Sequence, residues 1–232
     1  MVDILVYITL LLAGTWSYTS GKLTMAGSIT GAVIGLLIFK GAGLACFIML
    51  TIFFLIGSAA TRWQRDKKVL MNAADVRKGR RTAWQVLANS GVAAFLAAFA
   101  LWKPEYSTIS RLMIAGSFAA ATADTLSSEL GTVYGRRFYN ILTFKKDTRG
   151  LDGVVSLEGT LIGIFGAVAI AVVYALFYGW NIFVLWIVIA GFVGNVVDSV
   201  LGATLERKGL IGNNVINLLN TVTGALVCIL LM

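Results

Sequence analysis

Two aspartates stand in stretches that are otherwise apolar enough to lie inside a membrane. Asp124 is followed by Ser128 four residues later, and Asp198 is followed directly by Ser199. An unpaired carboxylate at the centre of a membrane helix costs about 2.5–3.5 kcal/mol, so such residues are candidates for function. Mg²⁺ prefers one or two carboxylates together with phosphate oxygens and water. The sequence therefore predicts Asp124 and Asp198 as catalytic and metal-binding residues.

Other polar residues accompany these aspartates at one depth of the expected bundle. Glu129 is a further catalytic candidate and metal ligand, and Glu158 is a further catalytic candidate. Basic side chains hold phosphates, and glycines let backbone amides approach them. We expect the substrate and nucleotide to contact Arg80, Arg81, Gln85, Asn89, Thr125, Ser128, Gly131, Gly135, Arg136, Lys145, Lys146, Ser156, Gly159, Thr160, Asn195, Asn213, Asn217 and Asn220.

The elements that must position these residues are membrane helices. The 232 residues are 58% hydrophobic and 13% charged, with a mean hydropathy of +0.85, whereas a soluble domain carries roughly 25% charged residues. The sequence predicts an all-α integral membrane protein, a single transmembrane domain over 1–232 with a bundle of about eight helices. The expected spans are Ile4–Trp16, Met25–Phe39, Leu44–Ala60, Trp84–Trp102, Leu112–Leu130, Val155–Tyr178, Ile182–Leu205 and Asn214–Leu231.

The first two of these spans are short, so they are expected to be tilted, or one of them re-entrant. The second carries Gly27, Gly31 and Gly35 at four-residue spacing, which predicts a smooth ridge for close helix packing.

Basic residues alternate between the connections. Of 19 Lys and Arg residues, 16 fall in the first, third, fifth and seventh loops. The positive-inside rule places those loops in the cytoplasm and both termini outside, in a protein integral to the cytoplasmic membrane. The third loop becomes a basic cytoplasmic segment over 61–83, and the fifth a cytoplasmic glycine-rich, basic loop over 131–154 near the active site. The net charge of +8 is therefore attributed to topology, and no nucleic-acid partner is expected.

The one-sided placement of polar groups favours an enzyme facing the cytoplasm. A transporter is expected to place polar groups near the midplane, open to both sides. The alternative for each amide or hydroxyl is a helix-bridging hydrogen bond of about 0.6 kcal/mol. Histidine is absent, which excludes His-dependent triads, and no Walker-type Gly-x4-Gly-Lys-Ser/Thr occurs.

Several segments resemble a known family, and Val197–Ser199 and Asn213–Thr223 resemble its closing motifs. Ala123–Gly131 resembles the Ala-Asp-Thr-x-x-Ser-Glu-x-Gly signature of the phytyl-phosphate kinase-like membrane family, also called domain of unknown function 92 or transmembrane protein 19-like. Gly79–Asn89 is similar to its Gln-Val-x-Ala-Asn segment, and Gly153–Thr160 to its Gly-Gly-Val-Ser-x-x-Gly-Thr segment. Dolichol and phytol kinases are more distantly similar. One departure is Leu151-Asp152, where the family pattern has a polar-Gly turn.

The resemblance implies a Mg²⁺-dependent kinase that uses CTP, or another nucleoside triphosphate, as phosphate donor. The expected reaction converts a phytyl- or geranylgeranyl-type monophosphate to its diphosphate. The alternatives are a prenol kinase, a CTP-dependent cytidylyltransferase, and a transporter of an ion or phosphorylated lipid. Expected partners are the prenyl phosphate, the nucleotide and membrane lipids; the oligomeric state stays open, with a homodimer as one option.

Overall fold

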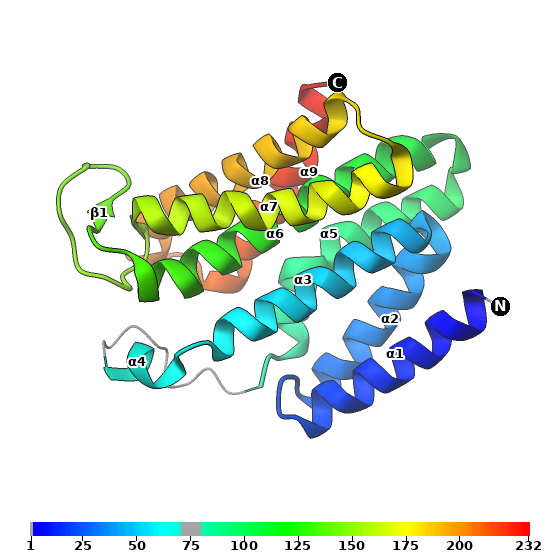
Figure 1. Ribbon diagram of the computed structural model, residues 1–232, viewed down its shortest axis with the longest axis horizontal. Helices are drawn as coiled ribbons and strands as arrows, with labels where there is room; N and C mark the ends of the chain where they lie inside the picture. The colour runs from blue at the N-terminus through cyan, green and yellow to red at the C-terminus, as the bar shows by residue number, and fades with distance from the viewer. Residues whose placement is uncertain (1, 71–79) are drawn as a thin grey trace.

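The computed structural model describes residues 2–70 and 80–232, and it is almost entirely helical (Figure 1). Apolar stretches of about 20 residues form these helices because a helix satisfies every backbone polar group within its own segment. The elements are α1 (Val2–Thr19), α2 (Met25–Ala42), α3 (Leu44–Arg62), α4 (Arg65–Leu70), α5 (Ala83–Trp102), the 3₁₀ turn η1 (Pro104–Tyr106), α6 (Ser107–Tyr134), β1 (Tyr139–Asn140), β2 (Val154–Val155), α7 (Leu157–Tyr178), α8 (Ile182–Leu201), the π-helical turn η2 (Gly202–Glu206) and α9 (Asn213–Leu230).

Within the described residues, seven helices are long and apolar enough to cross a membrane: α1, α2, α3, α5, α7, α8 continued into η2, and α9. This confirms the predicted all-α membrane bundle. The eighth long helix, α6, covers the expected span Leu112–Leu130 and extends beyond it at both ends. It is less apolar because it carries Arg111, Asp124 and Glu129.

Helix α6 lies at the centre of the bundle, packed against α3, α5, α7, α8 and α9. Small residues allow the close approach, as expected for membrane helices. Gly116 of α6 faces Gly224 of α9, and a Cβ on Gly131 of α6 would lie 2.6 Å from the Cα of Gly159 on α7. Residues 114–123 of α6 are all buried, and the partly buried Asp124 follows them directly.

The glycine ridge of α2 is only partly a packing surface. A Cβ on Gly27 would lie 2.7 Å from the carbonyl oxygen of Arg81, and one on Gly35 would lie 2.6 Å from Leu10. A Cβ on Gly31 would meet no atom within 4 Å. The prediction of a continuous ridge was therefore wrong at Gly31, which faces open space.

The loop expected over 131–154 begins later than predicted, because α6 continues through Tyr134 and Gly131 is helical. The loop contains a short antiparallel pair, in which Tyr139 lies opposite Val155 and Asn140 opposite Val154. Two-residue strands are too short to give an alternating pattern, so the sequence did not predict them.

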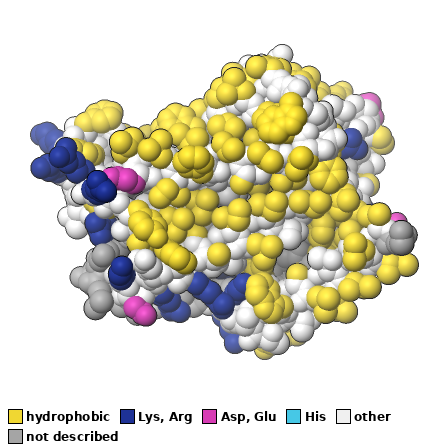
Figure 2. Space-filling model, viewed as in Figure 1, with side chains coloured by type: hydrophobic (Ala, Val, Ile, Leu, Met, Phe, Trp, Pro, Cys, Tyr) yellow, Lys and Arg dark blue, Asp and Glu magenta, His cyan; other side chains and the backbone are white. Residues whose placement is uncertain are grey.

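The odd-numbered loops meet at one end of the bundle. The backbone N–H of Arg81 donates to the carbonyl of Lys22 at 2.9 Å, which joins the first and third loops. The side chain of Arg207 donates to the carbonyl of Asp152 at 2.6 Å, which joins the fifth and seventh. Lys and Arg side chains gather at the end of the molecule where β1 and α4 lie, while the flank along the helices is mainly hydrophobic (Figure 2). Of the segment 61–83, residues 71–79 lie outside the described part.

Candidate active site

A polar cavity of about 280 Å³ opens at this end of the bundle. Its walls come from α3, α4, α5, α6, the loop that contains β1 and β2, α8, η2 and α9. It brings together 13 of the predicted site residues: Arg81, Gln85, Asn89, Asp124, Thr125, Ser128, Glu129, Gly131, Ser156, Asn195, Asp198, Asn213 and Asn217.

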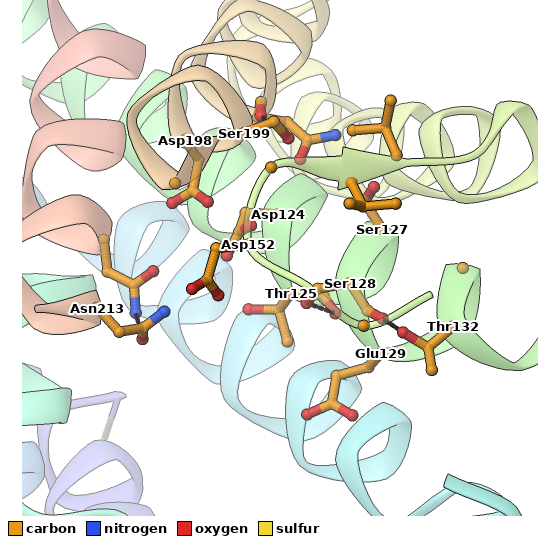
Figure 3. Close-up of a pocket in the computed structure, with 18 of the residues that line it drawn as sticks. Asp124, Thr125, Ser127, Ser128, Glu129, Thr132, Asp152, Asp198, Ser199 and Asn213 are labelled. Carbon is orange, nitrogen blue, oxygen red and sulfur yellow. Dashed lines mark hydrogen bonds between the residues drawn. The ribbon is translucent and has the colours of Figure 1, made fainter. Parts of the chain in front are cut away.

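Asp124 on α6 and Asp198 on α8 approach each other across this cavity (Figure 3). Their carboxyl groups are close enough to interact directly, and Asp152 and Glu206 are near enough to act on Asp198 as well. The Oδ2 atom of Asp198 is buried and has no hydrogen-bond partner in the described part of the chain. A buried carboxylate oxygen without a donor is costly unless a cation neutralises it.

The charge balance of the cavity also calls for a cation. Its described lining has five carboxylates (Asp124, Glu129, Asp152, Asp198, Glu206) and two cationic side chains (Lys68, Arg81). Across residues 2–70 and 80–232, no group of three or more Asp, Glu, Cys or His side chains forms a complete metal site. Mg²⁺ commonly binds through one or two carboxylates and completes its shell with phosphate oxygens and water. The pair Asp124 and Asp198 fits that mode of binding.

Lys68 belongs to the cavity although the sequence assigned it only to the basic segment. Its Nζ lies 2.7 Å from Oε2 of Glu129 and 2.8 Å from the carbonyl oxygen of Ala60. Lys68 is only 2% exposed, and the Glu129 side chain 14%. This buried ion pair fixes α4 against the C-terminal half of α6. Among eight basic residues in one loop, nothing in the sequence distinguished Lys68.

Replacing Lys68 with methionine is expected to lower the free energy of unfolding by roughly 3 kcal/mol, the low end for breaking a buried pair. The lower value is expected because the charge of Arg81 also acts on Glu129. Thermal unfolding in detergent measures the loss. The double variant Lys68→Met, Glu129→Gln should recover most of it, and a double variant no more stable than the single one would contradict the ion pair's role.

Arg81 reaches the cavity from the start of α5. Its backbone makes two hydrogen bonds with the first loop: its N–H donates to the carbonyl of Lys22, and its carbonyl accepts from the N–H of Thr24 at 3.0 Å. Its Nη2 donates to Oγ1 of Thr61 at 3.2 Å. Burial lowers the pKa of the Arg81 guanidinium, and the negative charge of Glu129 opposes that shift. A guanidinium keeps its proton under these conditions, so Arg81 presents a fixed positive charge suited to a phosphate.

Hydroxyls and amides complete the lining. Ser128 donates to the carbonyl of Thr125 at 3.2 Å, and Ser199 donates to that of Asn195 at 3.1 Å. These bonds remain within single helices, so they leave the hydroxyl lone pairs available as acceptors. Asn217 donates to Oδ1 of Asn213 at 3.0 Å across one turn of α9.

The loop that closes one side of the cavity is fixed by two residues. Gly153 has a φ of +70° and packs its backbone against Ala203, so a side chain there would be strained and would clash. Asp147 lies 2.9 Å from Nη2 of Arg207. The N–H of Thr148, and next the Arg207 side chain, lower the pKa of the Asp147 carboxyl below its usual value. Leu151 and Asp152, where the sequence departs from the family pattern, line the cavity, and the contacts of Gly153 and Asp147 fix the loop that carries them.

Nine predicted residues lie outside the cavity lining. Lys145 and Lys146 are exposed on the loop, and Arg80 stacks its guanidinium over Tyr18, 5.2 Å from the ring centre. Glu158 accepts a hydrogen bond from the N–H of Arg136 at 3.3 Å, so its carboxylate holds the loop. The other four residues make contacts within or between helices. Gly135 ends α6, Gly159 packs against α6, and the Thr160 hydroxyl donates to the carbonyl of Ser156. Asn220 donates from α9 to the carbonyl of Ala120 on α6 at 3.4 Å.

The lining also contains residues that the predicted set lacked: Thr61, Lys68, Ser127, Thr132, Asp152, Ser199 and Glu206. Ser199 and Glu206 share the polar end of the α8 segment with Asp198, and this was the signal in the sequence that could have found them.

Comparison with known proteins gives one family match. The family described as integral membrane protein DUF92 matches residues 8–225. Protein VTE6, chloroplastic, of Arabidopsis thaliana is 33% identical over 217 residues, which cover 90% of this chain. The chain spans 65% of the length of that plant protein.

Two further relatives are similar. An uncharacterized membrane protein of Methanocaldococcus jannaschii is 33% identical over 205 residues, covering 88% of this chain and 84% of its own. Protein PGR of Arabidopsis thaliana is 29% identical over 217 residues, covering 83% of this chain and 75% of its own. No solved structure matches the chain significantly.

Proposed function

The chain belongs to the DUF92 family of integral membrane proteins, and from this premise we propose that it is a CTP-dependent, Mg²⁺-dependent prenyl-phosphate kinase. The proposed acceptor is a phytyl- or geranylgeranyl-type monophosphate, and the product is its diphosphate. The observation that carries the proposal is the cavity in which Asp124 and Asp198 from two helices approach each other, and which Lys68 and Arg81 also line.

Phosphoryl transfer requires positioning and charge neutralisation more than covalent help from the protein. In the reaction, the bond between the γ-phosphorus and the oxygen bridging to the β-phosphate breaks, and CDP leaves with that electron pair. An oxygen of the prenyl monophosphate forms the new bond to the γ-phosphorus. The acceptor is already an anion, so the absence of histidine is no obstacle.

Each group of the chain has a defined role in this proposal. Asp124 and Asp198 hold Mg²⁺, which when bound neutralises charge on the nucleotide phosphates. Arg81 holds a phosphate by charge and hydrogen bonds. Lys68 keeps Glu129 neutralised at 2.7 Å, which prevents that carboxylate from repelling the substrates. The exposed Lys145 and Lys146 attract anionic nucleotide or lipid headgroups from outside the cavity.

The test is incubation of purified protein with Mg²⁺, CTP labelled at either the α- or the γ-phosphate, and prenyl alcohols and monophosphates. The proposal predicts γ-label in the prenyl diphosphate and α-label in CDP. An α-label in the lipid product would instead indicate a cytidylyltransferase. A γ-label that appears in the lipid product only when the acceptor is a prenyl alcohol would indicate a prenol kinase. Repeating the assay with each nucleoside triphosphate tests the preference for CTP.

A further inference from the structure

A second cavity, of about 110 Å³, lies between α1, α2, α3 and α5. Its exposed lining surface is mainly apolar, with Leu10, Phe47, Leu50 and Phe53 among the side chains that enclose it, and hydroxyl side chains such as Ser28 and Thr51 also line it. These helices lie together on one side of the bundle (Figure 1). The cavity therefore offers a surface for an apolar ligand and few groups for a polar one.

The two cavities share three residues. Arg81, Gln85 and Asn89 line both the polar cavity and the apolar one. Gln85 and Asn89 belong to the first turns of α5, and Arg81 lies two residues before this helix; the Thr82–Gln85 capping box fixes the first turn. A molecule bound across these residues would place an anionic end beside Arg81 and an apolar end among α1, α2 and α3.

The apolar cavity is kept open by two glycines. Gly14 of α1 and Gly31 of α2 both line it, and a Cβ on either would meet no atom within 4 Å. Neither glycine is therefore needed for close helix packing, in contrast to Gly27 and Gly35 on the same helix α2. Larger side chains at these positions would occupy the space without a clash against backbone.

We infer that the apolar cavity binds the hydrocarbon tail of the lipid phosphate, with Arg81, Gln85 and Asn89 at the junction between tail and headgroup. This inference rests on the proposed function for the headgroup site and adds the position of the tail. The ligand class is a long isoprenoid chain that ends in a phosphate. The part of the chain nearest the headgroup lies in the cavity, and the rest extends between the helices toward lipid.

The test compares Gly31→Leu with wild type on geranylgeranyl phosphate and on methyl phosphate, which has no hydrocarbon tail to enter the cavity. Filling the cavity should lower kcat/KM for the long substrate roughly tenfold, the effect of losing burial of about two methylene groups, and leave the short substrate within about twofold. Gly91→Leu is the matched control, because Gly91 on α5 also has open space around its Cβ but lines neither cavity. An unchanged ratio between long and short substrates in Gly31→Leu would overturn the inference.

A second measurement on wild-type protein is independent of turnover. Geranylgeranyl phosphate with a photoreactive diazirine in its tail should label peptides of α1, α2 or α3, and unlabelled geranylgeranyl phosphate should compete. Labelling confined to other helices would overturn the tail site. Labelling of α1–α3 without phosphate transfer to any acceptor would leave the tail site in place and remove the proposed function instead.

Discussion

Asp124→Asn is expected to reduce phosphate transfer by roughly a thousandfold or more, the scale on which charge-neutralising groups act in phosphoryl transfer. Asparagine has nearly the same shape as aspartate but lacks the negative charge that holds Mg²⁺. The protein should remain folded, because the change removes one of several carboxylates that act on one another in the cavity. Turnover with labelled CTP and circular dichroism in detergent measure the two effects separately.

The matched control for this variant is Asp3→Asn. Asp3 pairs with Lys40 at 3.2 Å, and both side chains are largely exposed at the other end of the bundle. This control should retain full turnover. Full turnover in Asp124→Asn would remove Asp124 from the mechanism.

Asp198→Asn is expected to cause a loss of similar size, and the double variant Asp124→Asn, Asp198→Asn should lose little more than either single one. Residues that act as one unit give such non-additive effects. Asp198→Asn should also stabilise the Mg²⁺-free protein, since it removes repulsion between neighbouring carboxylates and a buried oxygen without a partner.

Mg²⁺ titrations followed by thermal unfolding give the second readout. A ligand that binds only the folded state raises its melting temperature, so Mg²⁺ with CTP should raise the Tm of wild type and not that of Asp198→Asn. If the two single losses instead multiply in the double variant, the aspartates act separately, and the shared ion is the wrong explanation.

The sequence was sufficient to predict the helices and the gathering of the odd loops, because hydropathy and charge act locally. It also indicated which aspartates share a cavity, since Asp124 and Asp198 both lie in the later half of helices that run in the same direction. It was not sufficient for Lys68, because a lysine in a basic loop looks the same whether it is solvated or paired with Glu129. That distinction depends on where α4 packs.

Long-range packing also decides where several of the predicted residues lie. Glu158 has the residue type of a catalytic acid, but its carboxylate accepts from the backbone of Arg136. Asn220 continues the polar face of α9, yet its side chain bridges to α6. Gly31 shares its spacing with Gly27 and Gly35, and only the position of α1 and α5 determines which of these glycines is packed. Spacing defines a face of a helix but does not identify what that face contacts.

In the proposed site, carboxylates from α6 and α8 hold one divalent ion together with the phosphates of a nucleotide. Electron paramagnetic resonance of Mn²⁺, used in place of Mg²⁺ with the non-transferable β,γ-methylene analogue of CTP, measures this directly. We expect one nucleotide-dependent Mn²⁺ per chain in wild type and in Asp3→Asn, and its loss in Asp124→Asn and Asp198→Asn. Equal Mn²⁺ binding in all four proteins would contradict it.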